Sequence, residues 1–422
     1  YSQSGTPQVH ISDHFDAANQ RYTLSLKQHT PPTPDQEEKQ PLVLPFAVGL
    51  LNADGEELPL QFEGEAEAVN GTRMLVMEEA SQDYTFVNIA EAPVPSLFRD
   101  FSAPVKVFFD YTAEQLATLI AHDSDAFTRW DAAQRMAQIA ILEQCGRYSN
   151  GRELELDPSL VKAFGGILAD RNADPALLAE AMRLPDEDYL ADQMEVVAVA
   201  GIPAARNYIK QALAEHLEES FTERYNDLND GQPYQKSAVA MARRSLKNIC
   251  MSYLLETGKG ESLAAAQFDS SDNMTDTLAA LQGMVLRGSS LAESGLAGFE
   301  AKWKEDALVM DKWFVMQAIK PGAETVNAVE ILMDHPAFSI QNPNKVRALL
   351  GAFAMLNPTG FHTADGSGYR FHADRVVELD GINPQIAARM ASAFNRWKRY
   401  DDDRKALMST SSICSWLRNN SP

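Results

Sequence analysis

The chain has 422 residues, of which 45% are hydrophobic and 23% are charged, and its formal net charge at pH 7 is −22. This length exceeds what one compact core organises, so we expect two or three domains of a soluble globular protein. The acidic balance argues against nucleic acid as a partner, because phosphate binding requires clustered Lys and Arg. The sequence contains no run of 18 apolar residues, so we expect no membrane partner.

The first hundred residues predict short β-strands. Residues 21–27 alternate apolar and polar side chains with a period of two, and residues 42–51 form a longer apolar run. Further strands are expected at residues 73–77, 84–89 and 105–109. Short strands at regular spacing are typical of a β-sandwich.

The pattern changes near Asp110, and helical periodicity dominates from there on. Thr112 and Gln115 form a capping-box pattern that predicts the start of a helix. Asp157 and Asp174 each precede a proline, which predicts an N-cap followed by proline at the first helical position. Many helices joined by short turns predict a solenoid-like superhelical stack of helix pairs. The predicted fold class is therefore a small β-sandwich followed by an α-helical solenoid.

The cysteines indicate neither a disulfide framework nor a zinc knuckle. Cys145, Cys250 and Cys414 are odd in number, far apart and without a C-x-x-C pair, so a reducing, cytoplasmic location is expected. Cys145 and Cys250 lie in helical patterns and are predicted to be packed small hydrophobic residues.

The eight histidines never form His-Glu-x-x-His, the helical motif that binds zinc and places a carboxylate beside the metal-bound water. His10 and His14 are four residues apart in a strand-loop region, and chance spacing explains them better than a metal site does. His335, His362 and His372 fall at loop signals, where a solvated or hydrogen-bonded histidine is the default.

Two late helices carry arginine beside an apolar stripe. Residues 342–347 are typical of a helix start, and Arg347 lies beside the stripe of the helix that follows. Arg389 and Arg396 are seven residues apart, which places them on one side of a later helix. The predicted apolar face of that later helix comprises Ile386, Met390, Phe394 and Trp397. Arginine on a concave wall can hold carboxylates by charge-assisted hydrogen bonds, and a structural salt bridge is the alternative that stays open.

Several longer stretches together resemble bacterial aminopeptidase N. They comprise residues 1–7, 31–45, 101–106, 129–134, 273–276, 308–314, 342–344, 365–369 and 398–401. They occur in the order of that family and extend over nearly the whole chain up to about residue 403. The family is a zinc metallopeptidase that removes N-terminal residues from peptides.

This resemblance implies a domain organisation. Residues 1–8 would end a catalytic domain, residues 9–109 would form the β-sandwich, and residues 110–422 would form the helical C-terminal domain. The end after residue 403 is expected to be truncated or divergent, because residues 408–422 do not resemble the helical C-terminus of the family. The helical domain is expected to cap the catalytic domain and to line a chamber for short peptides, into which Arg347 and Arg389 would reach.

The resemblance also implies zinc in the full-length enzyme and none bound by this chain, because the zinc ligands and the catalytic glutamate would belong to upstream sequence. No catalytic residue is assigned, and the chain alone is expected to be inactive. The expected partners are the missing catalytic domain of the same protein and short peptides, in the cytoplasm of a bacterium. Two alternatives stay open, which are a free-standing helical-repeat module that binds peptides or proteins and a catalytically dead relative.

Overall fold

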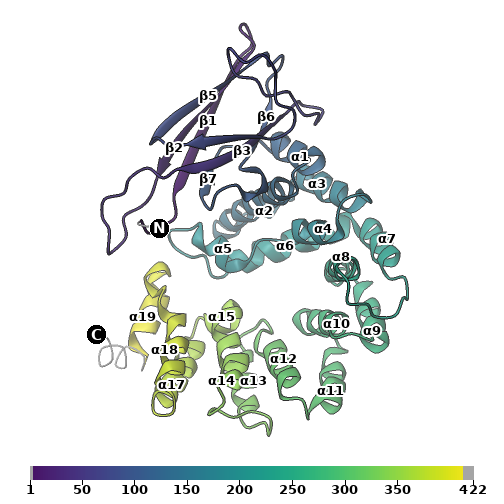
Figure 1. Cartoon of the computed structure of the whole chain (residues 1–422). Coiled ribbons are helices and arrows are strands. Elements are labelled where there is room, and N and C mark those ends of the chain that lie inside the picture. Colours follow the sequence, from purple (N-terminus) through teal and green to yellow (C-terminus); the bar gives the residue numbers. More distant parts are fainter. Residues whose placement is uncertain (1–2, 412–422) are drawn as a thin grey trace. The chain divides into compact units, whose positions relative to one another are not determined.

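The structure is a computed structural model, and it describes residues 3–411 (Figure 1). The chain divides into two compact units, which we describe separately. The sandwich unit comprises Tyr1–Ile139 and Asp157–Leu184, and the helical unit comprises Ala140–Leu156 and Pro185–Pro422. Strands end at Phe108 and helices begin at Ala113, and the predicted domain boundaries at residues 9, 110 and 403 stay a prediction.

The described strands all lie in the sandwich unit and form two sheets. They are β1 (Gln8–Asp16), β2 (Arg21–His29), β3 (Leu44–Leu51), β4 (Arg73–Met77), β5 (Ser81–Val87), β6 (Val94–Leu97) and β7 (Lys106–Phe108). One sheet has the order β5-β2-β1-β7 and the other has the order β4-β3-β6. Strands β1 and β7 pair in parallel, and the other neighbouring strands are antiparallel.

The alternating pattern of the strands places one face of each sheet in a shared core. Leu24 and Leu26 of β2 and Phe46 and Val48 of β3 are fully buried in this core. The predicted β-sandwich and the strands β2, β3 and β4 are confirmed. Strand β6 was not predicted, because its four residues are all buried and its sequence therefore shows no alternation.

Four α-helices contribute to the described part of the sandwich unit, and three of them start at the predicted caps. They are α1 (Ala113–His122), α2 (Ala126–Ser149, which continues into the helical unit), α3 (Pro158–Ala169) and α4 (Pro175–Met182). The Thr112 and Gln115 side chains form the capping box at α1. Asp157 and Asp174 cap α3 and α4, each with proline at the first position, so these predictions are confirmed.

A buried arginine joins the three-stranded sheet to the linker after α1. The Arg99 side chain is only 1% exposed, and its Nη2 and Nη1 donate to Asp123 Oδ1 and Glu57 Oε1, both at 2.9 Å. Its Nε donates to Ser96 Oγ at 2.7 Å. A Cβ on Gly49 would stand 2.2 Å from Arg99 Cζ, so only glycine leaves room for the guanidinium.

The backbone around Arg99 adopts an uncommon conformation. Phe98, Asp100 and Phe101 have φ angles of 54°, 55° and 50°, in the left-handed region that non-glycine residues seldom occupy. Such strain persists only where surrounding contacts hold the backbone in place. The 3-10 turn η1 (Arg99–Phe101) therefore depends on the ion pairs of Arg99.

The helical unit is a run of helices that follow one another along a curve, shown from teal to yellow in Figure 1. They are α5 (Glu187–Asp192), α6 (Gly201–His216), α7 (Glu218–Leu228), α8 (Ala238–Leu254), α9 (Gly260–Ser270), α10 (Met274–Arg287), α11 (Ala292–Trp303), α12 (Ala307–Ala318), α13 (Thr325–Leu332), α14 (Pro343–Val346), a π-helical turn η2 (Arg347–Gly351), α15 (Ala352–Leu356), α16 (Pro358–Phe361), α17 (Ser367–Asp380), α18 (Pro384–Ala391), the 3-10 turns η3 (Ser392–Phe394) and η4 (Trp397–Arg399), and α19 (Asp402–Thr410). Helices pack mainly on neighbours in the chain, as α7 does on α8 and α9 on α10. The predicted α-helical solenoid is confirmed.

The sequence predicts that residues 408–422 diverge from the family, and of these, residues up to 411 are described and belong to α19 or follow it, whereas the rest lie outside the described residues. Between residues 3 and 411, every helix is too short or too polar to cross a lipid bilayer.

A buried polar network fixes three neighbouring helices of the helical unit. Lys247 of α8 donates from Nζ to Asp276 Oδ2 of α10 at 2.7 Å, and both side chains are less than 10% exposed. Gln267 of α9 donates to Asn248 Oδ1 at 2.8 Å and to the Asp276 carbonyl at 3.1 Å. Asn273 caps α10 by accepting a hydrogen bond from the Asp276 N–H. These directional contacts set the register of α8, α9 and α10.

Replacing Arg99 by alanine is expected to lower the free energy of unfolding of the sandwich unit by about 3–5 kcal/mol, because Asp123 would stay buried without its cation. Urea titration with hydrogen exchange read at β2 and β3 measures this loss. Arg21→Ala removes a half-exposed pair with Glu63 and is the control, with an expected change below about 1 kcal/mol. Equal losses in the two variants would contradict the role given to Arg99.

Candidate functional site

The helix that precedes Arg347 begins as the sequence predicts. Asn342 caps α14 by accepting a hydrogen bond from the backbone N–H two residues later, and Pro343 occupies the first position. Lys345 anchors this short helix, because its Nζ donates to Asp311 Oδ1 of α12 at 2.6 Å and the Lys345 side chain is only 6% exposed. Arg347 therefore starts from a fixed backbone position.

Arg347 opens the single π-helical turn η2. Val346 and Leu350 are fully buried as predicted, whereas Arg347 is exposed. Its Nε donates to the Pro343 carbonyl at 3.1 Å and its Nη2 donates to Asn344 Oδ1 at 2.7 Å. Over residues 3–411 its guanidinium forms no ion pair, so its positive charge is available to a ligand. Single π-helical turns occur frequently at functional sites.

Arg389 lies near the end of α18, is exposed, and forms no ion pair with any described residue. Helix α18 is held by His372, whose Nε2–H donates to the Met390 carbonyl at 3.0 Å. The Met390 side chain packs on η2, where a Cβ on Gly351 would stand 3.5 Å from its methyl carbon and 3.9 Å from Arg347 Cβ. The two elements that carry Arg347 and Arg389 are thus in contact.

The prediction that Arg389 and Arg396 share one side of a helix is wrong. Helix α18 ends at Ala391, because Ser392 Oγ donates to the Arg389 carbonyl at 2.7 Å and the chain continues as 3-10 turns. Arg396 pairs with Asp192 at 3.1 Å. Arg396 therefore forms a structural salt bridge, whereas Arg347 and Arg389 form none with the described residues.

Two of the histidines expected at loops are buried in the helical unit. His362 Nδ1 lies 2.8 Å from the Tyr369 hydroxyl, and burial lowers the pKa of His362 to about 3, with Arg404 acting in the same direction. His372 lies inside α17 rather than in a loop, and burial lowers its pKa to about 4. Both histidines are hydrogen-bonded and neutral at pH 7, which suits packing rather than proton transfer.

The other histidines do not form a metal site. His10 and His14 both lie in β1, where four residues of extended strand separate their Cα atoms by about 13 Å. His335 Nε2 is 3.0 Å from Glu300 Oε1. Residues 3–411 contain no group of three or more His, Cys, Asp or Glu side chains placed to hold a metal ion. The donor set of the described residues therefore does not fit a zinc site.

The cysteines behave as the sequence predicts where they are described. Cys145 and Cys250 are both buried. Burial raises the pKa of the Cys145 thiol, so it is not an activated nucleophile. Cys414 lies outside the described residues.

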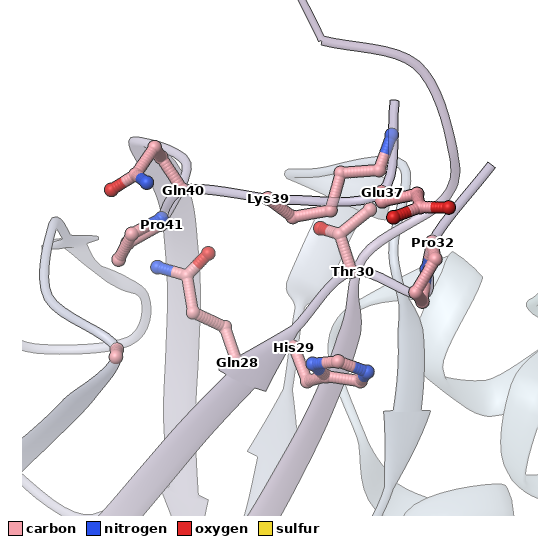
Figure 2. Close-up of a pocket in the computed structure, with 9 residues that line it drawn as sticks. Gln28, His29, Thr30, Pro32, Glu37, Lys39, Gln40 and Pro41 are labelled. Atoms are coloured by element: carbon pink, nitrogen blue, oxygen red, sulfur yellow. The ribbon is translucent and has the colours of Figure 1, made fainter. Parts of the chain in front are cut away.

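The sandwich unit has a hollow of about 220 Å³ beside β2. Figure 2 shows Gln28, Gln40 and Pro41 at one end of it and Thr30, Pro32 and Glu37 at the other. Two of the polar side chains around it make hydrogen bonds within the chain. Gln28 Nε2 donates to the carbonyls of Leu42 and Glu79, and Lys39 Nζ donates to Ser4, Thr33 and Gln36. We assign no ligand to this hollow.

Sequence reasoning missed the charged pairs between residues far apart in the sequence that position the helices. Lys345 and Asp311 are 34 residues apart, and Lys247 and Asp276 are 29 residues apart. The partner of Arg399 lies 207 residues away in the sequence. A pattern of local periodicity carries no information about partners at such separations. The sequence feature that could have indicated such a pair is a charged residue next to a predicted buried stripe, as Lys345 is next to Val346.

Two protein-family models match the chain. One is DUF3458, described as a domain of unknown function with an Ig-like fold, and it matches residues 5–110. The other is DUF3458_C, described as a domain of unknown function with ARM repeats, and it matches residues 113–411. Both descriptions agree with the observed strands and helices.

The chain is similar to curated proteins named aminopeptidase N. The relative from Escherichia coli is 38% identical over 410 residues, and the relative from Haemophilus influenzae is 39% identical over 412 residues. These alignments cover 97% of this chain but 47% and 46% of the relatives, so the chain spans about half their length. A solved structure of Legionella pneumophila aminopeptidase A in complex with aspartic acid matches with a TM-score of 0.84 and 28% identity, over 100% of this chain and 48% of that one.

The free energy of unfolding of the helical unit is expected to fall as the pH drops from about 6.5 to about 4. The pKa values of His362 and His372 are lowered in the folded chain, so below pH 6.5 the unfolded histidines bind protons that the folded ones do not. Each histidine contributes a slope of up to about 1.4 kcal/mol per pH unit. Urea titrations between pH 7 and pH 5 that follow the helical unit measure the combined slope of the two histidines.

The variant His372→Gln keeps a side-chain N–H for the Met390 carbonyl and should remove up to half of this slope. The matched control is His14→Gln, since His14 is exposed on β1. An unchanged slope in His372→Gln would show that burial of this histidine does not couple folding to pH.

Proposed function

The chain belongs to the DUF3458_C family and resembles the C-terminal region of bacterial aminopeptidase N, and from this premise we propose that it is the non-catalytic part of a zinc aminopeptidase. The parent enzyme would remove N-terminal residues from peptides in the bacterial cytoplasm. In this proposal the helical part caps the catalytic domain and lines the chamber that admits peptides. The observation that supports it most is the 38–39% identity to aminopeptidase N over 97% of the chain.

Within this proposal, Arg347 and Arg389 hold the carboxylate end of short peptides. Both side chains are exposed, and neither forms an ion pair over residues 3–411, although the chain carries a net charge of −22. The guanidinium group is planar, stays charged at any working pH and pairs with carboxylates through two parallel hydrogen bonds. The contact of Met390 with η2 supports a shared role, because it joins the elements on which the two arginines lie.

A helical-repeat module that binds peptides or proteins without an attached enzyme is the second candidate, favoured by the ARM-repeat description of residues 113–411. A catalytically dead relative is the third. The three candidates differ in what happens when the chain is joined to an aminopeptidase catalytic domain. Only the first predicts that Arg347 and Arg389 affect turnover of peptides.

The chain alone is expected to bind no stoichiometric zinc and to release no product from an alanyl reporter substrate. The physical reason is that the 422 residues lack His-Glu-x-x-His and that residues 3–411 lack another suitable donor set. Metal analysis of the purified chain and a reporter assay test this, with a full-length aminopeptidase N as the positive control. Zinc at one equivalent together with turnover would overturn the assignment as a non-catalytic part.

Arg347→Ala and Arg389→Ala, each made in a protein that joins this chain to a catalytic domain, are expected to raise KM for tripeptides. Loss of one charged hydrogen bond to a carboxylate costs about 1.5–3 kcal/mol, and a contact shared by ground state and transition state appears in KM rather than in kcat. A reporter without a carboxylate end should be hydrolysed as before. Arg347→Lys should give a KM for tripeptides between those of the unaltered protein and Arg347→Ala, because lysine keeps the charge and lacks the planar guanidinium.

The matched control for these variants is Arg183→Ala, since Arg183 follows α4 and forms an exposed pair with Glu180 in the last turn of that helix. Equal effects on peptide and reporter, or none on either, would contradict the carboxylate role.

A further inference from the structure

The two sequence-distant ends of the helical unit meet through Arg399 of η4. Its Nη1 donates to Asp192 Oδ1 at 2.9 Å, and its Nη2 donates to the carbonyls of Ala191 and Met194 at the end of α5. The Val197 N–H donates to the Arg399 carbonyl at 2.8 Å. Arg399 thus joins segments 207 residues apart, and Figure 1 shows the last helix, α19, returning toward α5.

The junction is polar and only partly shielded from water. Asp192 also pairs with Arg396 at 3.1 Å, and the side chains of Asp192, Arg396 and Arg399 are 46%, 49% and 30% exposed. Beside these residues in the sequence, the apolar side chains of Val196 and Trp397 are 54% and 38% exposed. Val197 and Tyr400 are buried beside these charges, each 9% exposed, so the ion pairs of the α5–η4 junction lie at the solvent-exposed edge of a small apolar cover.

Other contacts between helices of the helical unit use charged side chains that are more deeply buried than those of the α5–η4 junction. Helices α8, α9 and α10 are joined by buried side chains, among them Lys247 and Asp276, each less than 10% exposed. Elements of a solenoid contact their neighbours, so its two ends can separate without breaking an interface between consecutive helices. Exposed ion pairs contribute little to stability and are screened by salt, whereas buried pairs are screened much less.

We propose that Arg399 and Asp192 form a latch that closes the helical unit into a ring and that opens reversibly while the helices stay folded. In the closed state, the guanidinium satisfies carbonyls at the C-terminal end of α5, where a cation is favoured. In the open state, those carbonyls and the charged side chains bind water instead. Opening frees the segment that follows α18, the helix that bears Arg389. The latch does not rest on the proposed function.

Hydrogen exchange on the unaltered chain tests the latch first. Raising NaCl from about 0.1 M to about 1 M shortens the screening length from about 10 Å to about 3 Å. Amide exchange should accelerate in residues 191–199, Val197 above all, and in residues 396–408, while α8 and α10 keep their rates. No acceleration at Val197, or the same acceleration in α8 and α10, would overturn the proposal.

Arg399→Ala should raise exchange at Val197 by about 10-fold to 100-fold, because it removes charge-assisted hydrogen bonds to three acceptors. Arg399→Lys should give a smaller rise, since one ammonium cannot reach all three acceptors with the geometry of the fork. Arg183→Ala removes another exposed pair and should leave Val197 unchanged. A uniform rise across the helical unit in Arg399→Ala would show that the junction is part of the core, and the latch would be rejected.

Discussion

The guanidinium of Arg99 lies between the three-stranded sheet and the linker after α1, where it is 1% exposed. A buried cation is tolerated only with paired anions and satisfied donors, so its burial requires Asp123 and Glu57 at 2.9 Å. It also requires glycine at position 49, because a Cβ there would collide with Arg99. The left-handed φ of Phe98 is part of the same arrangement. The position of the linker after α1 and the local backbone strain in the sandwich unit therefore depend on one buried charge.

The helical unit solves a different problem, because apolar stripes alone leave the sliding of one helix along the next poorly determined. Directional pairs between neighbours remove that freedom. Lys247 with Asp276 fixes α8 against α10, and Lys345 with Asp311 fixes α14 against α12. The exposed position of Arg347 is thereby set two residues beyond a buried anchor, and this gives the proposed carboxylate contact a rigid base.

Local patterns predicted the parts of the fold that depend on local physics. The period-two run of β2, the capping box at Thr112 and the buried stripe around Val346 were all correct, because each reflects burial or hydrogen bonding within a few residues. The end of α18 was missed, since a single serine hydroxyl competes with the helical ladder. The exposure of Arg347 could be predicted from its place beside a buried apolar stripe. The partner of Arg399 could not be predicted, because it lies 207 residues away in the sequence.

The π-helical turn that begins at Arg347 also bears on how this region tolerates changes in length. A π-helical turn closes its hydrogen bonds one residue later than an α-helical turn, so it holds one residue more. Deleting any one residue of the turn would restore ordinary α-helical bonding, and everything upstream would rotate by about 100° relative to the helix that follows. Arg347 and the stripe could not then keep their present faces together. A one-residue deletion here would be more disruptive than most substitutions, and related chains that use this arginine should keep the same spacing between it and Phe353.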